Sequence, residues 1–368
     1  MAESSPRDFD AMADAWQRAI HEAQRRALRG SQIVADSYTV PVGPTPRELV
    51  WSLNKSRLYR YHPAAPQQQP ARRTPLLLVY ALINKPYIFD LHAEVSFIAY
   101  MLARGFDVYL LDWGAPGPED RHTRFDDYAT EYLPRAVRKM LRVSGAHEFS
   151  MMGYCIGGTL SVLYAALHPA APLRNLLLLA SPLDFSQRDS IFANWFDDRF
   201  FNIDSFVDRL PAGLVPAELV EMGGLMLKPV DNYVGTYAML WERLDSPDSV
   251  THWQAVHRWV HDSVPFAGEA FRQWVKDYIR ANELIDSRHV AKGVRADLAN
   301  ITASFFNIVA EHDHIVPPSH STTIMGKIGS TDKQQVIAPS GHVGLMCSRS
   351  AKRTLWPQIA GWLAERSA

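Results

Sequence analysis

Cysteine is scarce in this chain, whose 368 residues include only two, Cys155 and Cys347. So few thiols exclude a disulfide-stabilised scaffold. They fit a reducing compartment, in which each thiol is free to act as a nucleophile. An excess of either charge is also lacking, because 38 Lys and Arg residues face 39 Asp and Glu residues, for a net charge of −1. Without an overall basic field, we expect no nucleic-acid partner.

Long apolar runs are missing as well. Stretches such as residues 76–83 and 176–180 are far shorter than the roughly 20 residues that a membrane-spanning helix needs. The first residues, MAESSPRDFD, lack the basic and apolar regions of a secretory signal. The sequence therefore predicts a cytoplasmic protein without a membrane span.

The first part of the chain predicts an isolated helix and then a loop. Residues 8–29 carry apolar side chains at helical spacing, namely Phe9, Met12, Trp16, Ile20 and Ala23. We expect this helix to end at Gly30. Its apolar face either packs on its own domain or docks a partner. Residues 62–75 contain four prolines and three consecutive glutamines, which predicts a loop or linker.

After this loop, short apolar runs alternate with helical patterns. The expected strands are residues 76–80, 106–111, 148–152, 174–180, 304–309 and 334–338. The expected helices are residues 91–104, 126–143, 158–167 and 351–365. Fully apolar runs are typical of buried parallel strands, and their alternation with helices predicts an α/β fold with a mostly parallel, doubly wound sheet.

One long segment, residues 186–290, breaks this alternation. It holds five of the ten tryptophans and seven of the sixteen phenylalanines. We interpret it as a mainly helical cap inserted into a catalytic core formed by residues 62–185 and 291–368, with residues 1–61 as a lead-in. Part of this cap is expected to cover the reactive centre or to be mobile.

The reactive centre is predicted from the sequence Gly-Tyr-Cys-Ile-Gly-Gly, residues 153–158, which lies between a strand and a helix. The form G-x-nucleophile-x-G is that of the nucleophile elbow of α/β-hydrolases, with Cys155 in place of serine. Glycines are needed because the nucleophile sits on a sharp turn against a neighbouring strand and helix. The N-terminus of the following helix favours a thiolate and a developing oxyanion.

A nucleophile elbow calls for an acid and then a histidine after later strands. Asp313 follows the strand at 304–309, and His342 follows the strand at 334–338 between two glycines. Glu311 is an alternative acid, and His314 is interpreted as a supporting residue. Cys347 has no comparable surroundings, so we expect it to pack in the core.

The oxyanion should be bound by backbone N–H groups. One donor is that of Ile156, immediately after the nucleophile, and the second is that of Leu82 or Ile83, of which we favour Ile83. The chain has no phosphate-binding loop and no cluster with metal-ligand spacing, so no metal is expected.

With these features the chain resembles the polyhydroxyalkanoate synthases, of the short two-component kind known as classes III and IV. The resemblance extends from about residue 42 to the end and is carried by LLLVYALINKPYIFDL, GFDVYLLDWGAPG, GYCIGGTL, ASPLDFS, PFAGEAFRQW, DHIVPP and SGHVG. It implies Cys155 as covalent nucleophile, His342 as base and Asp313 as the acid that orients it.

The same resemblance implies an acyltransferase that polymerises (R)-3-hydroxyacyl-CoA, such as 3-hydroxybutyryl-CoA, into a polyester with release of CoA. It implies no cofactor beyond this substrate, a homodimer, a second and smaller subunit, and association with polyester granules. Two alternatives remain: a Cys-dependent hydrolase acting on thioesters or lactones, and a non-catalytic granule or partner-binding protein on the same fold.

Overall fold

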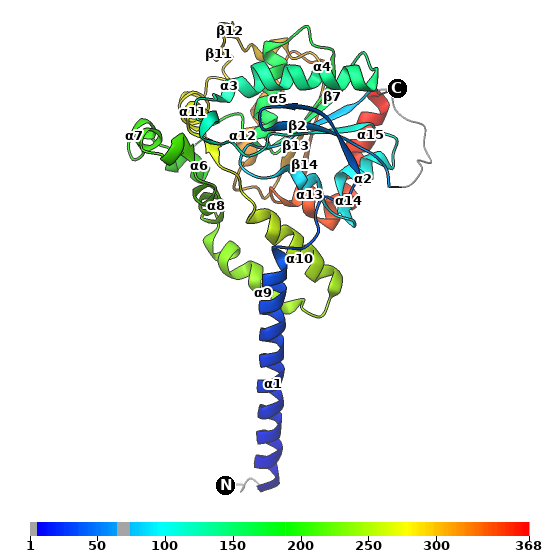
Figure 1. The fold of residues 1–368 in the computed structure, drawn as a ribbon, viewed down its shortest axis with the longest axis vertical. Helices are drawn as coiled ribbons and strands as arrows, with labels where there is room; N and C mark the ends of the chain where they lie inside the picture. The colour runs from blue at the N-terminus through cyan, green and yellow to red at the C-terminus, as the bar shows by residue number, and fades with distance from the viewer. Residues whose placement is uncertain (1–5, 65–73, 188, 368) are drawn as a thin grey trace.

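An eight-stranded sheet forms the centre of the molecule, which the computed structural model describes over residues 6–64, 74–187 and 189–367 (Figure 1). The strand order is β1-β2-β6-β3-β7-β8-β13-β14. The strands are β1 (Arg47–Leu53), β2 (Ser56–Tyr61), β3 (Leu76–Val79), β6 (Val108–Asp112), β7 (Phe149–Tyr154), β8 (Leu173–Leu179), β13 (Ser304–Ala310) and β14 (Lys333–Ala338).

The six strands from β6 to β14 in this order run parallel, and they confirm the six predicted strands. All residues of β3 and β7 are buried, since helices cover both faces of a parallel sheet. Helix α5 (Ile156–Leu167), which follows β7, is itself buried along its whole length. The carboxyl ends of β7, β13 and β14 therefore lie at one edge of a rigid, closely packed core.

The other helices of this core surround the sheet (Figure 1). They are α2 (Phe97–Leu102), α3 (Phe125–Asp127), α4 (Leu133–Ser144), α12 (Pro318–Thr322), α13 (Gly344–Cys347), α14 (Arg349–Thr354) and α15 (Trp356–Arg366). Short 3₁₀ or π segments are η1 (Pro86–Phe89), η2 (Pro118–Asp120), η3 (Tyr128–Tyr132), η7 (Leu298–Asn300) and η8 (Thr323–Gly326). Residues 126–143 are thus helical as predicted, with a π turn at η3.

Several elements differ from the predicted ones. The expected helix at 91–104 begins only at Phe97, because residues before it form the hairpin β4 (Asp90–His92) and β5 (Val95–Ser96). The buried Asp90 carboxylate holds this hairpin by accepting bonds from the Ser96 hydroxyl and from Thr45. The hairpin β1–β2 was not predicted, and it places residues 47–61 in the central sheet, since β2 pairs antiparallel with β6.

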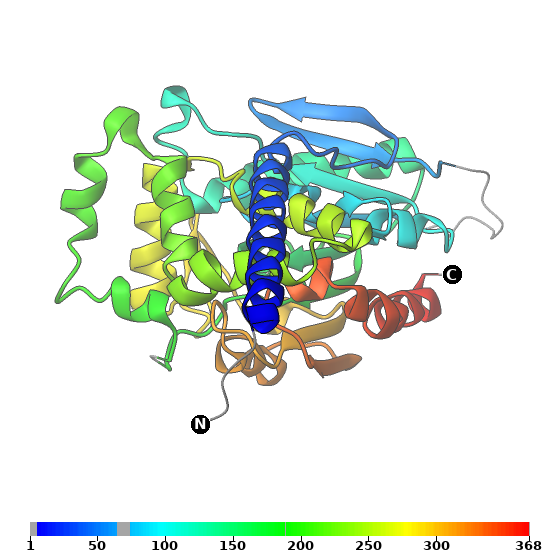
Figure 2. The same cartoon turned by 90° about the horizontal axis from the view of Figure 1, so that it is seen from below.

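The N-terminal helix α1 (Pro6–Ser37) is longer than the predicted 8–29 and stands away from the body in Figure 1, whereas Figure 2 views it nearly end-on. Gly30 does not end it, although glycine costs a helix interior about 1 kcal/mol relative to alanine. Near its C-terminal end, Ile33 is buried in a small cluster that it shares with Leu240, Leu244 and Trp253. Packing at its base therefore compensates for the glycine.

Residues 186–290 form a layer of short helices. These are α6 (Ile191–Trp195), α7 (Ile203–Asp208), α8 (Ala217–Leu225), α9 (Thr236–Glu242), α10 (Pro247–Val260) and α11 (Gly268–Gln273), with η4 (Pro211–Gly213), η5 (Asp231–Gly235) and η6 (Trp274–Arg280). The remaining strands are short pairs: β9 (Leu214–Val215) with β10 (Phe266–Ala267), and β11 (Val290–Ala291) with β12 (Val294–Arg295). In the described part of the chain, no helix combines the length and apolarity that crossing a membrane requires.

Helix α5 approaches the residues at the ends of β3 and β8 so closely that a side chain finds no room at two of its positions. A Cβ atom on Gly157 would lie 2.3 Å from the Val79 carbonyl oxygen, and one on Gly158 would lie 1.8 Å from Ser181 Oγ. Backbone atoms of a buried strand have little room to move, so Gly157 in particular fixes how the helix meets the sheet.

We predict that Gly157→Ala lowers the free energy of unfolding by about 3 kcal/mol, because overpacking here would push α5 off the sheet. Gly361 in α15 is the matched control, since nothing lies within 4 Å of a Cβ built there. Gly361→Ala should stabilise the protein by up to about 1 kcal/mol. Urea unfolding of both variants checks this, and equal stabilities would contradict the packing explanation.

Candidate active site

Cys155 lies on the turn between β7 and α5, and its backbone is strained. Its φ of 56° and ψ of −131° lie in a region that a residue with a side chain seldom adopts. The strain is held in place by hydrogen bonds, because its N–H donates to the Leu179 carbonyl at 2.9 Å and its carbonyl accepts from the Gly158 N–H at 2.8 Å. The turn therefore presents Cys155 at the carboxyl edge of the sheet.

Asp313 follows β13, and its two carboxylate oxygens have different partners. Oδ1 accepts the N–H groups of Ile315 and Val316, at 2.9 and 2.8 Å. Oδ2 lies 2.6 Å from Nδ1 of His342. The loop backbone thus fixes the carboxylate, and the carboxylate in turn fixes the orientation of the imidazole.

His342 is buried between Asp313 and Cys155. Burial alone lowers the pKa of the ring, but the Asp313 carboxylate and a hydrogen bond with Cys155 outweigh it and raise this pKa to about 10. Since Nδ1 faces Asp313, Nε2 is the nitrogen left for Cys155. The buried ring therefore holds a proton more firmly than an exposed imidazole does.

Tyr154 is a further contact of His342 that sequence reasoning missed. Its hydroxyl donates to the His342 carbonyl oxygen at 2.9 Å, and its ring stacks on the imidazole with centroids 5.3 Å apart. Burial raises the pKa of Tyr154 well above its usual range, so the hydroxyl stays protonated and remains a donor. The sequence signal that could have pointed to Tyr154 is its position next to Cys155 in the elbow.

The other residues weighed from the sequence have different partners from these three side chains. The Glu311 side chain is 54% exposed and lies 4.0 Å from the ring of His312, which makes Asp313 rather than Glu311 the acid that contacts His342. The Nδ1 atom of His314 lies 3.2 Å from the His312 carbonyl oxygen, and burial lowers the pKa of the His314 ring. Burial raises the pKa of Cys347 to about 12, as expected of a thiol packed in the core.

A cavity of about 640 Å³ opens on Cys155. Ile83, Ile156 and His342 line it beside the thiol. Most of its remaining wall comes from residues 186–290 and is apolar, including Trp195, Phe196, Phe201, Phe206, Leu219, Met222, Trp259, Phe266, Phe271 and Trp274. Cys155 itself is only 7% exposed, as expected if this segment covers the reactive centre.

Ile156 and Ile83, the predicted oxyanion donors, both border the cavity. The Ile83 carbonyl accepts the Val264 N–H at 3.0 Å, and the Asn84 side chain donates to the Ser263 hydroxyl at 3.1 Å. These bonds tie the loop after β3 to the segment that precedes α11. The position of the proposed second donor is therefore fixed by contacts with residues 263–264.

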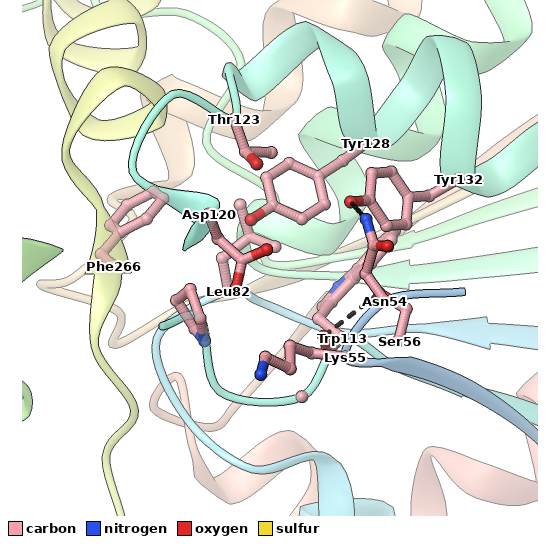
Figure 3. Close-up of a pocket in the computed structure, with 12 residues that line it drawn as sticks. Asn54, Lys55, Ser56, Leu82, Trp113, Asp120, Thr123, Tyr128, Tyr132 and Phe266 are labelled. Carbon is pink, nitrogen blue, oxygen red and sulfur yellow. Dashed lines mark hydrogen bonds between the residues drawn. The ribbon is translucent and has the colours of Figure 1, made fainter. Parts of the chain in front are cut away.

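A second, smaller pocket lies behind this loop, and Cys155 does not reach it (Figure 3). Trp113 forms one wall and donates its indole N–H to the Tyr80 carbonyl at 2.9 Å. Asn54 donates to the Tyr132 hydroxyl, and Ser56 donates to the Trp113 carbonyl. Figure 3 draws the last two of these bonds, and they indicate a packing role for the Asp-Trp-Gly turn at residues 112–114, after β6.

Within the described residues, one group has donor atoms close enough together to hold a metal: Asp277, Glu283 and His289. Both ring nitrogens of His289 already face carboxylates, Nε2 that of Asp126 at 2.9 Å and Nδ1 that of Glu283 at 3.2 Å. Burial lowers the pKa of His289, but these carboxylates raise it overall, which fits a protonated ring in an ion network. None of the three lines the Cys155 cavity.

Comparisons with solved structures agree on the fold. A soluble variant of the Saccharomyces cerevisiae monoglyceride lipase superposes with a TM-score of 0.58 at 12% identity, covering 90% of this chain and 98% of that one. A Paleococcus ferrophilus monoacylglycerol lipase gives 0.51 at 17% identity, covering 84% and 99%. A family model for the alpha/beta hydrolase fold matches residues 74–346. At these identities the likeness concerns the architecture alone.

Sequence comparisons are more specific. A family model described as the Poly-beta-hydroxybutyrate polymerase (PhaC) N-terminus matches residues 16–101. The poly(3-hydroxyalkanoate) polymerase subunit of Allochromatium vinosum is 36% identical over 97% of this chain and 99% of its own length. The corresponding subunit of Haloferax mediterranei is 35% identical over 96% of this chain and 70% of its own length. The chain therefore belongs to the poly(3-hydroxyalkanoate) polymerase family and has the α/β-hydrolase fold.

Proposed function

We propose that this polymerase transfers (R)-3-hydroxyacyl groups from CoA thioesters to Cys155 and joins them into a polyester. The observation that carries this proposal is the thiol of Cys155, which contacts the His342–Asp313 pair at the wall of an apolar, aromatic-lined cavity. Short substrates such as 3-hydroxybutyryl-CoA are what the likeness to classes III and IV implies.

In the first step His342 takes the thiol proton, and the thiolate attacks the thioester carbonyl. The N–H groups of Ile156 and Ile83 are the proposed donors to the resulting oxyanion. When the intermediate collapses, the bond to the CoA sulfur breaks, the His342 proton passes to that sulfur, and an acyl-Cys155 thioester remains. One thioester has replaced another, so this step is nearly balanced in energy.

In the second step the 3-hydroxyl of another unit gives its proton to His342 and attacks the acyl-Cys155 carbonyl. An ester bond forms, the carbon–sulfur bond breaks, and the proton returns to the Cys155 sulfur. Water would compete with this hydroxyl, so the site must be dry. Residues 186–290, with their aromatic lining, act in this proposal as a cap that excludes water.

The chemistry needs no metal or prosthetic group, because the CoA thioester brings the activated acyl group. A growing apolar chain bound at Cys155 would keep the enzyme at the surface of cytoplasmic polyester granules. A homodimer and a smaller second subunit complete the assembly that the family resemblance implies.

Incubation with (R)-3-hydroxybutyryl-CoA, followed by separate measurement of CoA, free 3-hydroxybutyrate and polymer, tests the proposed reaction. We expect CoA release with insoluble polyester and little free acid. Free acid in amounts equal to CoA would instead identify a thioesterase, and absence of all three products would contradict catalysis.

We predict that Cys155→Ala lowers CoA release by more than about 10³-fold, because it removes the attacking atom. Cys347→Ala is the matched control and should retain most of the activity, since burial keeps the pKa of that thiol at about 12. Iodoacetamide followed by peptide mass spectrometry should label Cys155 before Cys347. Polymer made by Cys155→Ala would disprove the covalent mechanism.

We predict that Asp313→Asn lowers the pKa of His342, because the carboxylate that most strongly opposes the effect of burial is removed. Because the pKa of His342 is raised in the folded protein, this residue contributes its full stabilisation of the fold below pH 6.5. The contribution is lost as the pH rises through about 10. The difference in unfolding free energy between wild type and variant should therefore shrink between pH 7 and pH 11, as urea titrations can measure. CoA release should fall by about 10²–10⁴-fold. A pH-independent difference would refute the assignment.

A further inference from the structure

The indole N–H of Trp274 is a buried hydrogen-bond donor without a partner, on a residue of the cavity wall. Trp274 lines the Cys155 cavity and is 6% exposed. Its Nε1 atom is closed to water, and no acceptor among the described residues bonds to it. Of the buried polar side-chain atoms left unpaired in the described part of the chain, this is the one whose residue lines the cavity. Native proteins contain few such atoms, so this donor calls for an explanation.

Most other polar side chains on the cavity wall are already engaged. The Trp259 indole N–H donates to the Lys85 carbonyl oxygen at 3.0 Å. The Glu221 carboxylate lies 2.7 Å from the ring of His261. The amide and hydroxyl side chains that also have partners are those of Asn84, Ser263 and Asn232. Trp274 thus differs from its neighbours on the wall in having a donor left over.

The backbone that carries this indole is firmly attached to the core. Trp274 begins the π-helical segment η6, and π turns are rare and often occur at functional sites. Gln273 donates to the Asp126 carboxylate at 2.8 Å, and its carbonyl oxygen accepts the Asp126 N–H at 3.2 Å. The Tyr278 hydroxyl donates to the same carboxylate at 2.8 Å. These bonds hold the start of η6 to α3, which lies beside α11 (Figure 1).

The chemistry of an indole limits what it can bind. Its N–H donates one hydrogen bond and accepts none, and the rest of the ring system is apolar. It therefore suits a ligand whose polar atoms are acceptors and whose remaining surface is apolar. A polyester of hydroxyacyl units is such a ligand, because its ester carbonyl groups are separated by apolar carbons and its one hydroxyl lies at the chain end.

The cavity has room for more than the reacting unit. Its volume of about 640 Å³ is typical of sites that hold a drug-sized molecule. The carbonyl that reacts is assigned to the N–H groups of Ile156 and Ile83, which leaves the Trp274 N–H for a different carbonyl. We propose that Trp274 donates a hydrogen bond to an ester carbonyl oxygen of the polyester chain attached to Cys155. This inference rests on the proposed function and assigns Trp274 to the chain rather than to the monomer.

Both partners of the proposed bond lack an alternative. A hydrogen bond usually contributes little, because each group gives up a bond to water in order to form it. The Trp274 N–H has no bond to water to give up. The ester carbonyls of a polyester have no donor within the chain apart from its terminal hydroxyl. Formation of the bond therefore favours the enzyme with a chain bound over the empty enzyme.

A carbonyl oxygen can reach this N–H only after part of the wall moves, since the atom is closed to water in this structure. Phe196 lies edge-on against the indole, with ring centroids 6.5 Å apart, and it lines the cavity itself. Phe196 is only half-buried, whereas Trp274 is buried. We therefore expect the Phe196 ring to turn aside when the chain enters.

Rapid-quench measurement of CoA release from (R)-3-hydroxybutyryl-CoA tests the proposal with Trp274→Phe, which keeps an aromatic ring and removes the N–H. The first CoA released per active site should appear at the wild-type rate, because no chain is yet present. Later turnovers should slow about 5- to 10-fold, as expected for the loss of one neutral hydrogen bond. The polymer, sized by chromatography, should be at least 2-fold shorter because the chain is held less firmly.

Trp362→Phe is the matched control. Trp362 is 5% exposed and its N–H also lacks a partner, but it lies in α15 and does not line the cavity. This variant loses the same ring volume, and both phases of CoA release and the polymer length should be unchanged.

A second replacement separates hydrogen bonding from packing. Trp274→benzothienylalanine puts sulfur in place of the N–H and keeps nearly the same ring shape. It should slow the later turnovers as Trp274→Phe does. Its urea unfolding midpoint without substrate should equal or exceed that of wild type, because an unpaired donor does not stabilise the free protein. A purely structural role predicts the reverse, namely normal turnover with this ring.

Wild-type rates of later turnover in both Trp274 variants would overturn the proposal. Slow turnover in Trp274→Phe alone would assign the effect to ring packing and reject the hydrogen bond. A slower first turnover would show that the N–H serves the monomer and reject its assignment to the chain. Wild-type enzyme that releases no CoA and makes no polymer would contradict the proposed function itself, and this result is read without either variant.

Discussion

The bond between Asp313 and His342 is the interaction on which the candidate site depends. It joins the loop after β13 to the loop after β14, and through Cys155 to the turn after β7, so the ends of three strands of the sheet meet at one buried charged contact. A buried charge is tolerated only where hydrogen bonds compensate for lost water. Two backbone N–H groups satisfy the other oxygen of Asp313, and Tyr154 stacks on the His342 ring and donates to its carbonyl oxygen.

The parts of this arrangement that the sequence predicts are those encoded locally. Buried parallel strands have no polar face, and therefore they stand out as apolar runs. The elbow is recognisable because its glycines fill places where no side chain fits, as at Gly157. The order of Cys155, Asp313 and His342 follows from the order of strands in the fold.

The parts that escaped prediction depend on distant contacts. Tyr154 reaches the His342 carbonyl across 188 residues, and no local pattern encodes that bond. The hairpin β1–β2 is a half-exposed sheet edge, so it lacks the continuous apolar run that identifies the other strands. The helix α1 continues past Gly30 because tertiary packing of Ile33 and Val34 outweighs the intrinsic cost of glycine.

The aromatic lining of the cavity also gives the molecule an optical property. Trp195, Trp259 and Trp274 all border the space in front of Cys155, whereas Trp356 and Trp362 lie buried in the core. Indole emission shifts to shorter wavelength when water leaves its surroundings. An apolar chain that fills this space contacts all three indoles, and it displaces most water from Trp195, which is 40% exposed. The occupancy of the cavity is thus readable in the protein's own fluorescence, without a label and independently of CoA release.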